Sequence, residues 1–155
     1  MKKMGFTMVE LIFVIVILGI LAAVAIPKLM ATRDDAIITK IRTDISNIRG
    51  AISSLHAKNL MEGKVNYPNA LDDAEANKEE EELFDGNSTI GDLLDYPIYS
   101  KKSNGYWMKI DETNYTVKIM DNDIQFNYYK DDKGKFDCNS LNSGKADDIC
   151  KKLTH

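Results

Sequence analysis

Glu10 is a candidate functional residue, because it is the one charged side chain in a long apolar run. Among the 21 residues from Phe6 to Ile26, only Thr7, Glu10 and Gly19 fall outside the apolar set. A carboxylate inside a membrane-spanning segment costs about 2.5–3.5 kcal/mol on insertion scales. Two interpretations stay open. The carboxylate reaches the lipid headgroups, or it awaits a positive partner from another chain or from an amino group made by cleavage just upstream.

The apolar run is long enough to cross a membrane. As a helix with a rise of about 1.5 Å per residue, Phe6–Ile26 spans about 31 Å, the thickness of a hydrocarbon core. Lys2 and Lys3 precede the run, and positive charge at this end predicts a cytoplasmic N-terminus. A cleaved secretory signal is the alternative, but the run is longer than a usual signal core and leads into a helical pattern. We therefore expect the segment to be retained.

The first thirty residues resemble a known family. They read Lys2-Lys3-Met4-Gly5, then Phe6-Thr7-Met8-Val9-Glu10, then the apolar run ending at Ile26-Pro27. This order resembles the class III leader of type IV pilins and type II secretion pseudopilins. The resemblance implies that a prepilin peptidase cuts between Gly5 and Phe6 and then N-methylates Phe6. It also implies that Glu10 pairs with the Phe6 amino group of a neighbouring subunit during assembly.

The same resemblance implies a location and a set of partners. The subunit would begin as a single-pass protein of the bacterial inner membrane, with its globular domain in the periplasm, and would then enter a filament. Its partners would be other pilin-like subunits, the prepilin peptidase, and an inner-membrane assembly platform with its ATPase. Physical reasoning agrees, because an apolar helix that leaves the bilayer can bury its surface only against copies of itself. Head-to-tail contacts that do not close generate helical filaments.

Two residues weaken the helix locally. Gly19 costs about 1 kcal/mol and Pro27 about 3 kcal/mol relative to alanine in a helix interior. One interpretation is that both are tolerated imperfections of a membrane helix. The other is that the stretch between them unwinds or bends as subunits pack.

Beyond Pro27 the pattern becomes that of an amphipathic helix. Apolar residues recur at alternating spacings of three and four and form one face of the helix, which we call the isoleucine seam: Ile38, Ile41, Ile45, Ile48, Ile52 and Leu55. The pattern fades near Asn59, and Gly63 is a suitable helix stop. The sequence therefore predicts four segments: a leader over residues 1–5, a transmembrane assembly helix over 6–26, its amphipathic continuation over 27–60, and a globular domain with a C-terminal disulfide loop over 61–155.

Three short runs in the globular domain have the alternation of half-buried strands. They are Tyr106–Ile110, Tyr115–Met120 and Ile124–Tyr129, and turn-forming residues separate them. We expect a three-stranded antiparallel meander whose apolar face is covered by the seam of isoleucines. The predicted fold is α+β and pilin-like, with a long N-terminal helix packed on a small antiparallel sheet.

Cys138 and Cys150 are the only two cysteines. A membrane-anchored chain whose bulk lies outside the cytoplasm meets an oxidising compartment, so a disulfide is the favoured interpretation. Two free thiols or half of a metal site are the alternatives. Type IV pilins also close a C-terminal loop with a disulfide, which agrees with the resemblance.

Other polar groups invite weaker interpretations. Asp131, Asp132 and Asp137 lie around a glycine, and some major pseudopilins bind calcium in this region, but the spacing matches no recognised calcium loop. The charge-rich run Asp72–Glu82 is expected to be a solvated loop or a short exposed helix. His56, one residue past the apolar seam, is assigned no role.

Two triplets could accept a glycan. Asn87 and Asn114 each begin an Asn-x-Ser/Thr triplet and each follow an acidic residue two positions upstream, as in the acceptor sequences of some bacterial N-glycosylation systems. Both are expected in loops or turns. Short matches of this kind also arise by chance in a chain rich in Asp and Asn.

The composition excludes several functions. The net charge is −4, with 24 acidic and 20 basic residues, which argues against a protein that tracks nucleic-acid phosphates. A DNA-binding minor pilin is a further alternative and would need a basic tip. The candidates for such a tip are three lysines near the C-terminus, Lys145, Lys151 and Lys152, which give it weak support. The residues assemble no catalytic constellation and no cofactor site, so we expect no enzyme and no cofactor.

The function predicted is that of a filament subunit, a pseudopilin of a type II secretion or DNA-uptake system. A true or minor type IV pilin is the alternative, favoured by the cysteine pair. An alternative of a different class is a monomeric, signal-anchored periplasmic binding domain whose N-terminus would not be cut.

Overall fold

The computed structural model describes residues 6–139 and 144–154, so the predicted leader lies outside the described residues. The elements, in chain order, are α1 (Met8–Met61), β1 (Glu82–Leu83), β2 (Gly86–Asn87), β3 (Gly91–Asp92), β4 (Ile98–Tyr99), β5 (Trp107–Lys109), β6 (Asn114–Ile119), β7 (Asn122–Tyr129), β8 (Lys135–Cys138) and α2 (Lys145–Thr154). The chain divides into two compact units, one up to Ala36 and one from Ile37 onward. The α+β prediction of a long N-terminal helix followed by small antiparallel sheets is confirmed.

The first unit is the apolar part of α1. Among the described residues, α1 is the one helix that is long and apolar enough to cross a membrane, judged by length and composition. Its backbone stays helical through both Gly19 and Pro27. Unwinding between Gly19 and Pro27 was expected only as subunits pack into a filament. The structure holds a single chain, so this interpretation stays a prediction.

The second unit contains the amphipathic part of α1. The six residues of the predicted seam are all buried, from Ile38 to Leu55. The helix ends at Met61 in a Schellman motif, in which the Lys64 N–H donates to the Asn59 carbonyl (2.8 Å) and the Gly63 N–H to the Leu60 carbonyl (3.1 Å). Gly63 adopts φ +81°, a conformation that a residue without Cβ adopts at little cost. The glycine therefore stops the helix as predicted.

Four antiparallel strands, not three, form the main sheet, in the order β5-β6-β7-β8. The three predicted strands are present. The prediction of a three-stranded meander was wrong in missing β8, which pairs with β7 through Tyr128↔Phe136 and Phe126↔Cys138. Phe136 is the one large apolar residue of β8, so the strand has no alternating run that sequence inspection could detect.

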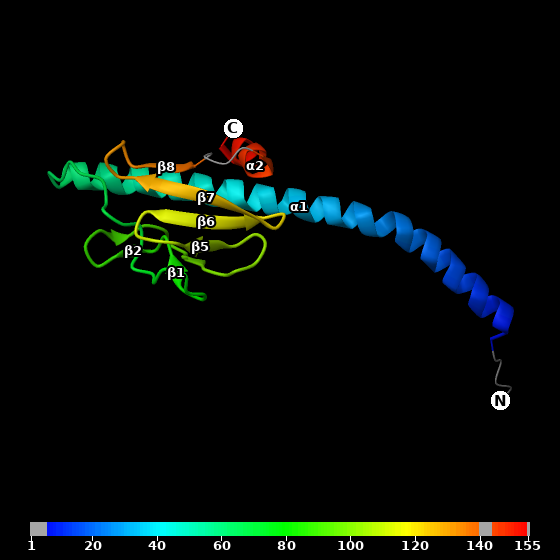
Figure 1. The fold of residues 1–155 in the computed structure, drawn as a ribbon. Coiled ribbons are helices and arrows are strands. Elements are labelled where there is room, and N and C mark those ends of the chain that lie inside the picture. Colours follow the sequence, from blue (N-terminus) through cyan, green and yellow to red (C-terminus); the bar gives the residue numbers. More distant parts are fainter. Residues whose placement is uncertain (1–5, 140–143, 155) are drawn as a thin grey trace, which may run out of the picture. The chain divides into compact units, whose positions relative to one another are not determined.

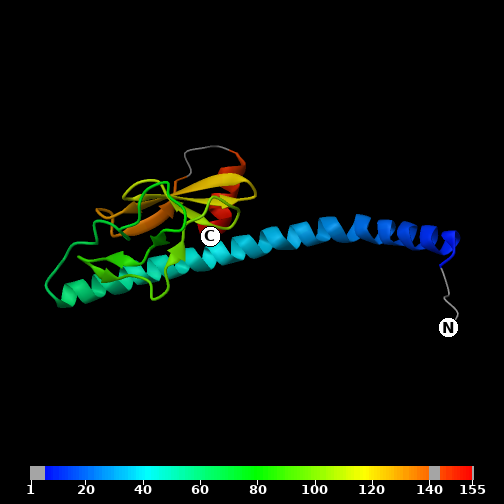
Figure 2. The ribbon, with the colours of Figure 1, turned by 90° about the horizontal axis from the view of Figure 1, so that it is seen from below.

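The apolar face of the sheet packs against the seam of α1. Trp107, Tyr115, Val117 and Phe126 are fully buried on this face. Figure 1 shows the sheet lying along the part of α1 after Ile37, and Figure 2 shows the same packing from below. The indole of Trp107 donates to the carboxylate of Asp44 on α1, at 3.1 Å. The predicted cover of the sheet by the isoleucine seam is therefore confirmed.

The segment between α1 and the main sheet holds a two-stranded sheet, a small hairpin and one buried charge. β1 pairs with β4, and β2 with β3. The run Asp72–Glu82 is exposed over most of its length, as expected, but its first residue is not: Asp72 is 1% exposed. The expectation of a solvated run was wrong for Asp72. Its partner is Lys109 in β5, 37 positions further along the chain. No local sequence pattern around Asp72 could indicate a partner so distant in the sequence.

Asp72 is the centre of a buried polar cluster. Its Oδ1 accepts from the ammonium of Lys109 (2.7 Å), and its Oδ2 accepts from the hydroxyl of Tyr115 (2.8 Å) and the N–H of Phe84 (3.0 Å). Burial, followed by the charge of Asp72, raises the pKa of Tyr115 far above its usual value, so the hydroxyl keeps its proton and donates. These bonds satisfy a charge that would otherwise be costly to bury. The cluster fixes the segment before β1 to the sheet.

Candidate assembly segment

The first turn of α1 contains a capping box made by Thr7 and Glu10. The N–H and the hydroxyl of Thr7 both donate to Oε2 of Glu10, each at 2.8 Å, and the N–H of Glu10 donates to the Thr7 hydroxyl at 3.3 Å. Thr7 is the residue before the helix, and Glu10 is its third residue. A Ser/Thr-x-x-Glu box of this kind satisfies backbone donors that a helix start leaves unpaired. Glu10 therefore has a partner within its own chain, which the sequence interpretation missed although Thr-x-x-Glu is a recognised signature.

The capping box occupies only one of the two oxygens of Glu10. Both Thr7 bonds end on Oε2, and no other residue within the described part of the chain donates to Oε1. The first residues of the helix are exposed, with Met8 at 77%, and so is Phe6 before it, at 85%. A carboxylate fixed through one oxygen, with the other open, can accept a further donor from a second molecule.

The surface that follows is apolar throughout. From Phe6 to Met30, the large apolar side chains of the described unit are all at least 40% exposed. A continuous apolar surface of this length requires lipid or another apolar surface as its neighbour. Gly5, on the other side of the predicted cleavage point, lies outside the described residues.

The two cysteines form the predicted disulfide. Cys138 at the end of β8 is bonded to Cys150 on α2, with 5.9 Å between their Cα atoms. Helix α2 also buries Ile149 and Leu153, and the guanidinium of Arg42 on α1 donates to the carbonyl of Lys152 at 2.6 Å. The disulfide and these contacts attach the C-terminus to the core.

The acidic residues considered for calcium do not form a cluster. Asp137 accepts from Arg49 at 3.1 Å and lies 3.2 Å from the ammonium of Lys135, so two cations already neutralise it. Asp131 and Asp132 are exposed in the preceding turn. Within residues 6–139 and 144–154, no group of three or more His, Cys, Asp or Glu side chains could hold a metal ion. We therefore propose no calcium site.

His56, near the end of α1, contacts Tyr67. Their rings stack at 3.7 Å between centroids, just before the end of α1. The stack packs the segment that leaves the helix against it. The stack is a packing contact within the second unit.

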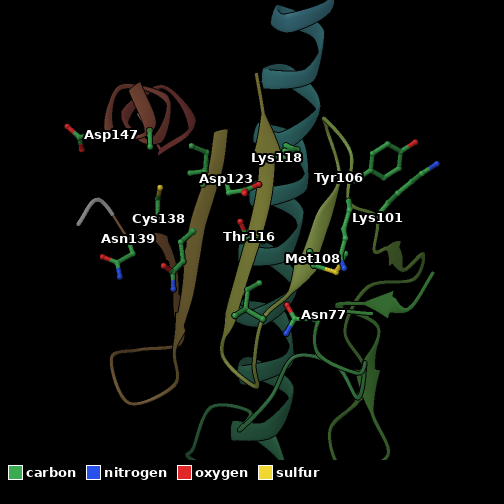
Figure 3. A pocket seen from close by; sticks show the side chains of 15 residues that line it. Asn77, Lys101, Tyr106, Met108, Thr116, Lys118, Asp123, Cys138, Asn139 and Asp147 are labelled. Atoms are coloured by element: carbon green, nitrogen blue, oxygen red, sulfur yellow. The ribbon is translucent and has the colours of Figure 1, made fainter. Parts of the chain in front are cut away.

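A pocket of about 510 Å³ lies on the sheet face opposite α1. Figure 3 shows Tyr106, Thr116, Lys118 and Asp123 on this face, with α1 behind the sheet. Basic and acidic side chains both line the pocket, so its charge favours neither anions nor cations. Nothing in this lining selects a ligand.

The N-terminal segment matches the family model of the prokaryotic N-terminal methylation motif over residues 1–26. The chain is 36% identical over 75 residues to type II secretion system core protein G of Pseudomonas aeruginosa, covering 48% of this chain and 49% of that protein. It is 39% identical over 51 residues to the protein of the same name from Klebsiella pneumoniae, covering 33% of this chain and 36% of that protein.

A second kind of relative belongs to a pilus. The chain is 37% identical over 62 residues to a type IV narrow pilus major component of Thermus thermophilus, covering 39% of this chain and 53% of that protein. No solved structure gives a significant match. The chain thus spans about a third to a half of the length of these curated relatives.

These names describe components of a secretion system and of a pilus, in agreement with the expectation that the chain is a structural subunit and not an enzyme. They also agree with the family resemblance carried by Gly5, Phe6 and Glu10. The chain carries the prepilin-type N-terminal methylation motif and is related, over part of its length, to type II secretion core protein G and to a type IV pilus component.

Proposed function

We propose that this chain is a pilin-like filament subunit, most similar in role to the pseudopilins of type II secretion. A prepilin peptidase cuts between Gly5 and Phe6 and methylates the new amino group. Before assembly, the subunit is anchored in the inner membrane, with its N-terminus in the cytoplasm and its second unit in the periplasm. An assembly platform and its ATPase then move it into the filament.

One observation carries this proposal: Glu10 keeps an oxygen open at the exposed start of an apolar helix. In the filament, that oxygen accepts from the methylated Phe6 amino group of a neighbouring subunit. The contact pairs an isolated carboxylate with a cation in apolar surroundings, where leaving either group unpaired is costly. It also fixes the axial offset between subunits.

The second candidate is a true or minor type IV pilin. The Cys138–Cys150 disulfide supports it, because it closes a C-terminal loop, and the relative from Thermus thermophilus is named as a pilus component. Both candidates share the processing and the assembly contact. They differ in the machine that the filament serves.

The test separates the charge of Glu10 from its capping role. Glu10→Gln keeps an acceptor oxygen for the capping box and removes the charge, because glutamine also serves at this position. Thr7→Ala is the matched control, because it removes the capping hydroxyl and keeps the charge. Each variant is expressed in the native host, and filaments are counted by electron microscopy with membrane levels measured by immunoblot.

We expect Glu10→Gln to stay in the membrane and form no filaments, whereas Thr7→Ala still assembles. Normal filaments from Glu10→Gln contradict the assembly role of the charge. Loss of filaments in Thr7→Ala alone shows that the capping box, not the intersubunit pair, is the function of these residues.

A further inference from the structure

We propose that Asn87 is the attachment site of an N-linked glycan and that Asn114, in the same kind of triplet, is not modified in the folded protein. Both triplets have an acidic residue two positions upstream, Asp85 and Glu112. The two sites match the same sequence pattern, but they lie in different structural surroundings. The inference goes beyond the proposed function and depends on it only for the location of the domain outside the cytoplasm.

Asn87 lies in a small hairpin outside the main sheet. It ends β2, which pairs with β3 through Gly86↔Asp92 and Asn87↔Gly91. The rest of its triplet, Ser88 and Thr89, is exposed in the turn between the two strands. An enzyme can therefore approach this triplet without opening the four-stranded sheet.

The side-chain amide of Asn87 is held with its nitrogen available. Its Oδ1 accepts from the N–H of Thr89 (2.9 Å) and of Ile90 (3.0 Å), which fixes the orientation of the amide. Across the described part of the chain, no acceptor takes a hydrogen bond from its Nδ2. The atom that must form the new bond is thus free of competing contacts.

Asn114 presents the opposite situation. Its Nδ2 donates to Oδ2 of Asp111 at 2.7 Å, and its backbone pairs with Asn127 of β7. The middle residue of the triplet, Tyr115, is fully buried and bonded to Asp72. The third, Thr116, lies within the sheet, between β5 and β7 (Figure 3). Presenting this triplet to an enzyme requires separating β6 from both neighbours.

The chemical step is a glycosyl transfer. The donor is an oligosaccharide joined through a diphosphate to a membrane polyprenol. The Nδ2 of Asn87 forms a bond to the anomeric carbon of the first sugar, while the bond from that carbon to the diphosphate oxygen breaks. The lipid diphosphate leaves with the electron pair, and one amide proton passes to a base of the transferase.

The test uses full-length protein purified from the native membranes and digested with trypsin. The two triplets fall on different peptides, Glu79–Lys101 and Ile110–Lys118. Mass spectrometry with fragmentation then reads each site separately. We expect sugar residues on the first peptide and the unmodified mass for the second.

Matched variants assign the site. Thr89→Val removes the hydroxyl of the triplet but keeps the backbone N–H that holds Asn87, and it should abolish the glycan. Ser88→Ala leaves the triplet intact, and Thr116→Val destroys only the second triplet, so both should keep the glycan. A bare Glu79–Lys101 peptide from wild-type protein, or sugar on Ile110–Lys118, overturns the inference.

The same digest distinguishes this inference from the proposed function. N-methylated Phe6 with a bare Glu79–Lys101 peptide overturns the glycan alone and leaves the filament proposal intact. An uncut N-terminus together with a bare peptide overturns both.

Discussion

Glu10 accepts two hydrogen bonds from Thr7, both on the same carboxylate oxygen, at the point where α1 begins. This arrangement gives the residue two states. In the isolated subunit Glu10 caps the N-terminus of α1. In the proposed filament its second oxygen also accepts from a neighbour's amino group. A charge in an apolar segment is therefore partly satisfied before assembly, which lowers the cost of holding it there.

The buried pair of Asp72 and Lys109 should control the stability of the second unit. Lys109→Met leaves the carboxylate, whose side chain is fully buried, without its cation. We expect the free energy of unfolding to fall by about 3–5 kcal/mol. Urea unfolding of the full chain in detergent, followed by the fluorescence of the single tryptophan, Trp107, measures this. The double variant Asp72→Asn with Lys109→Met should recover part of the loss. A fall below about 1 kcal/mol for the single variant contradicts the structural role of the pair.

Asp85 should make the protein less stable as the pH rises through its titration. Burial first, and then the charge of Asp72, raises the pKa of Asp85 in the folded state, and its Oδ1 is buried with no hydrogen-bond partner among the described residues. Because the folded state binds this proton more tightly than the unfolded state, ionisation of Asp85 costs stability above the unfolded pKa. Asp85→Asn should therefore stabilise the protein at neutral pH more than at acidic pH. Equal effects of Asp85→Asn at pH 3 and pH 7 in urea unfolding argue against this ionisation cost.

The disulfide should stabilise the C-terminus through its closed loop. Cys138 and Cys150 are 12 positions apart, and a loop of this length contributes about 3 kcal/mol in the chain-entropy model. Unfolding of the full chain with and without a reductant measures the difference. The double variant Cys138→Ala with Cys150→Ala should match the reduced protein and stay unaffected by reductant. An unchanged urea midpoint on reduction would show that α2 is held by packing alone.

Gly134 should not tolerate a side chain. Its φ is +62°, and an added Cβ would collide with the ring of Tyr67, which stacks on His56. We expect Gly134→Ala to lower the free energy of unfolding by about 1–3 kcal/mol, as overpacking does. Gly50→Ala is the control, because this exposed helical position has open space around it and alanine should stabilise the helix by up to about 1 kcal/mol. Equal effects of the two changes would rule out the clash.

The sequence predicted what periodicity and local chemistry encode. The isoleucine seam, three strands of the sheet and the cysteine pair were all readable, because each has a repeating pattern or a small number of candidates. Burial of Asp72 was not, since it depends on Lys109 and Tyr115, which only the folded chain brings near. The Thr-x-x-Glu pattern of Thr7 and Glu10 predicts a capping box, but the family signature in the same residues implies a pair with a neighbour's amino group.

The surroundings of the two Asn-x-Ser/Thr triplets also could not be predicted from the sequence. Both were expected in loops or turns, yet Asn114 begins a central strand of the main sheet and Asn87 ends a strand of a small hairpin. The difference comes from strand pairing, which a short motif does not encode. Only the fold separates an accessible triplet from one held in a sheet.

The identity of the N-terminal residue in protein recovered from native membranes tests most directly whether this chain is processed as a filament subunit. Intact mass together with fragmentation of the N-terminal peptide gives both the cleavage point and the modification. We expect a chain that begins at Phe6 and carries one methyl group on its amino nitrogen. A chain that still begins at Met1, from a host that processes its other prepilins, would contradict it and make a signal-anchored domain the better description.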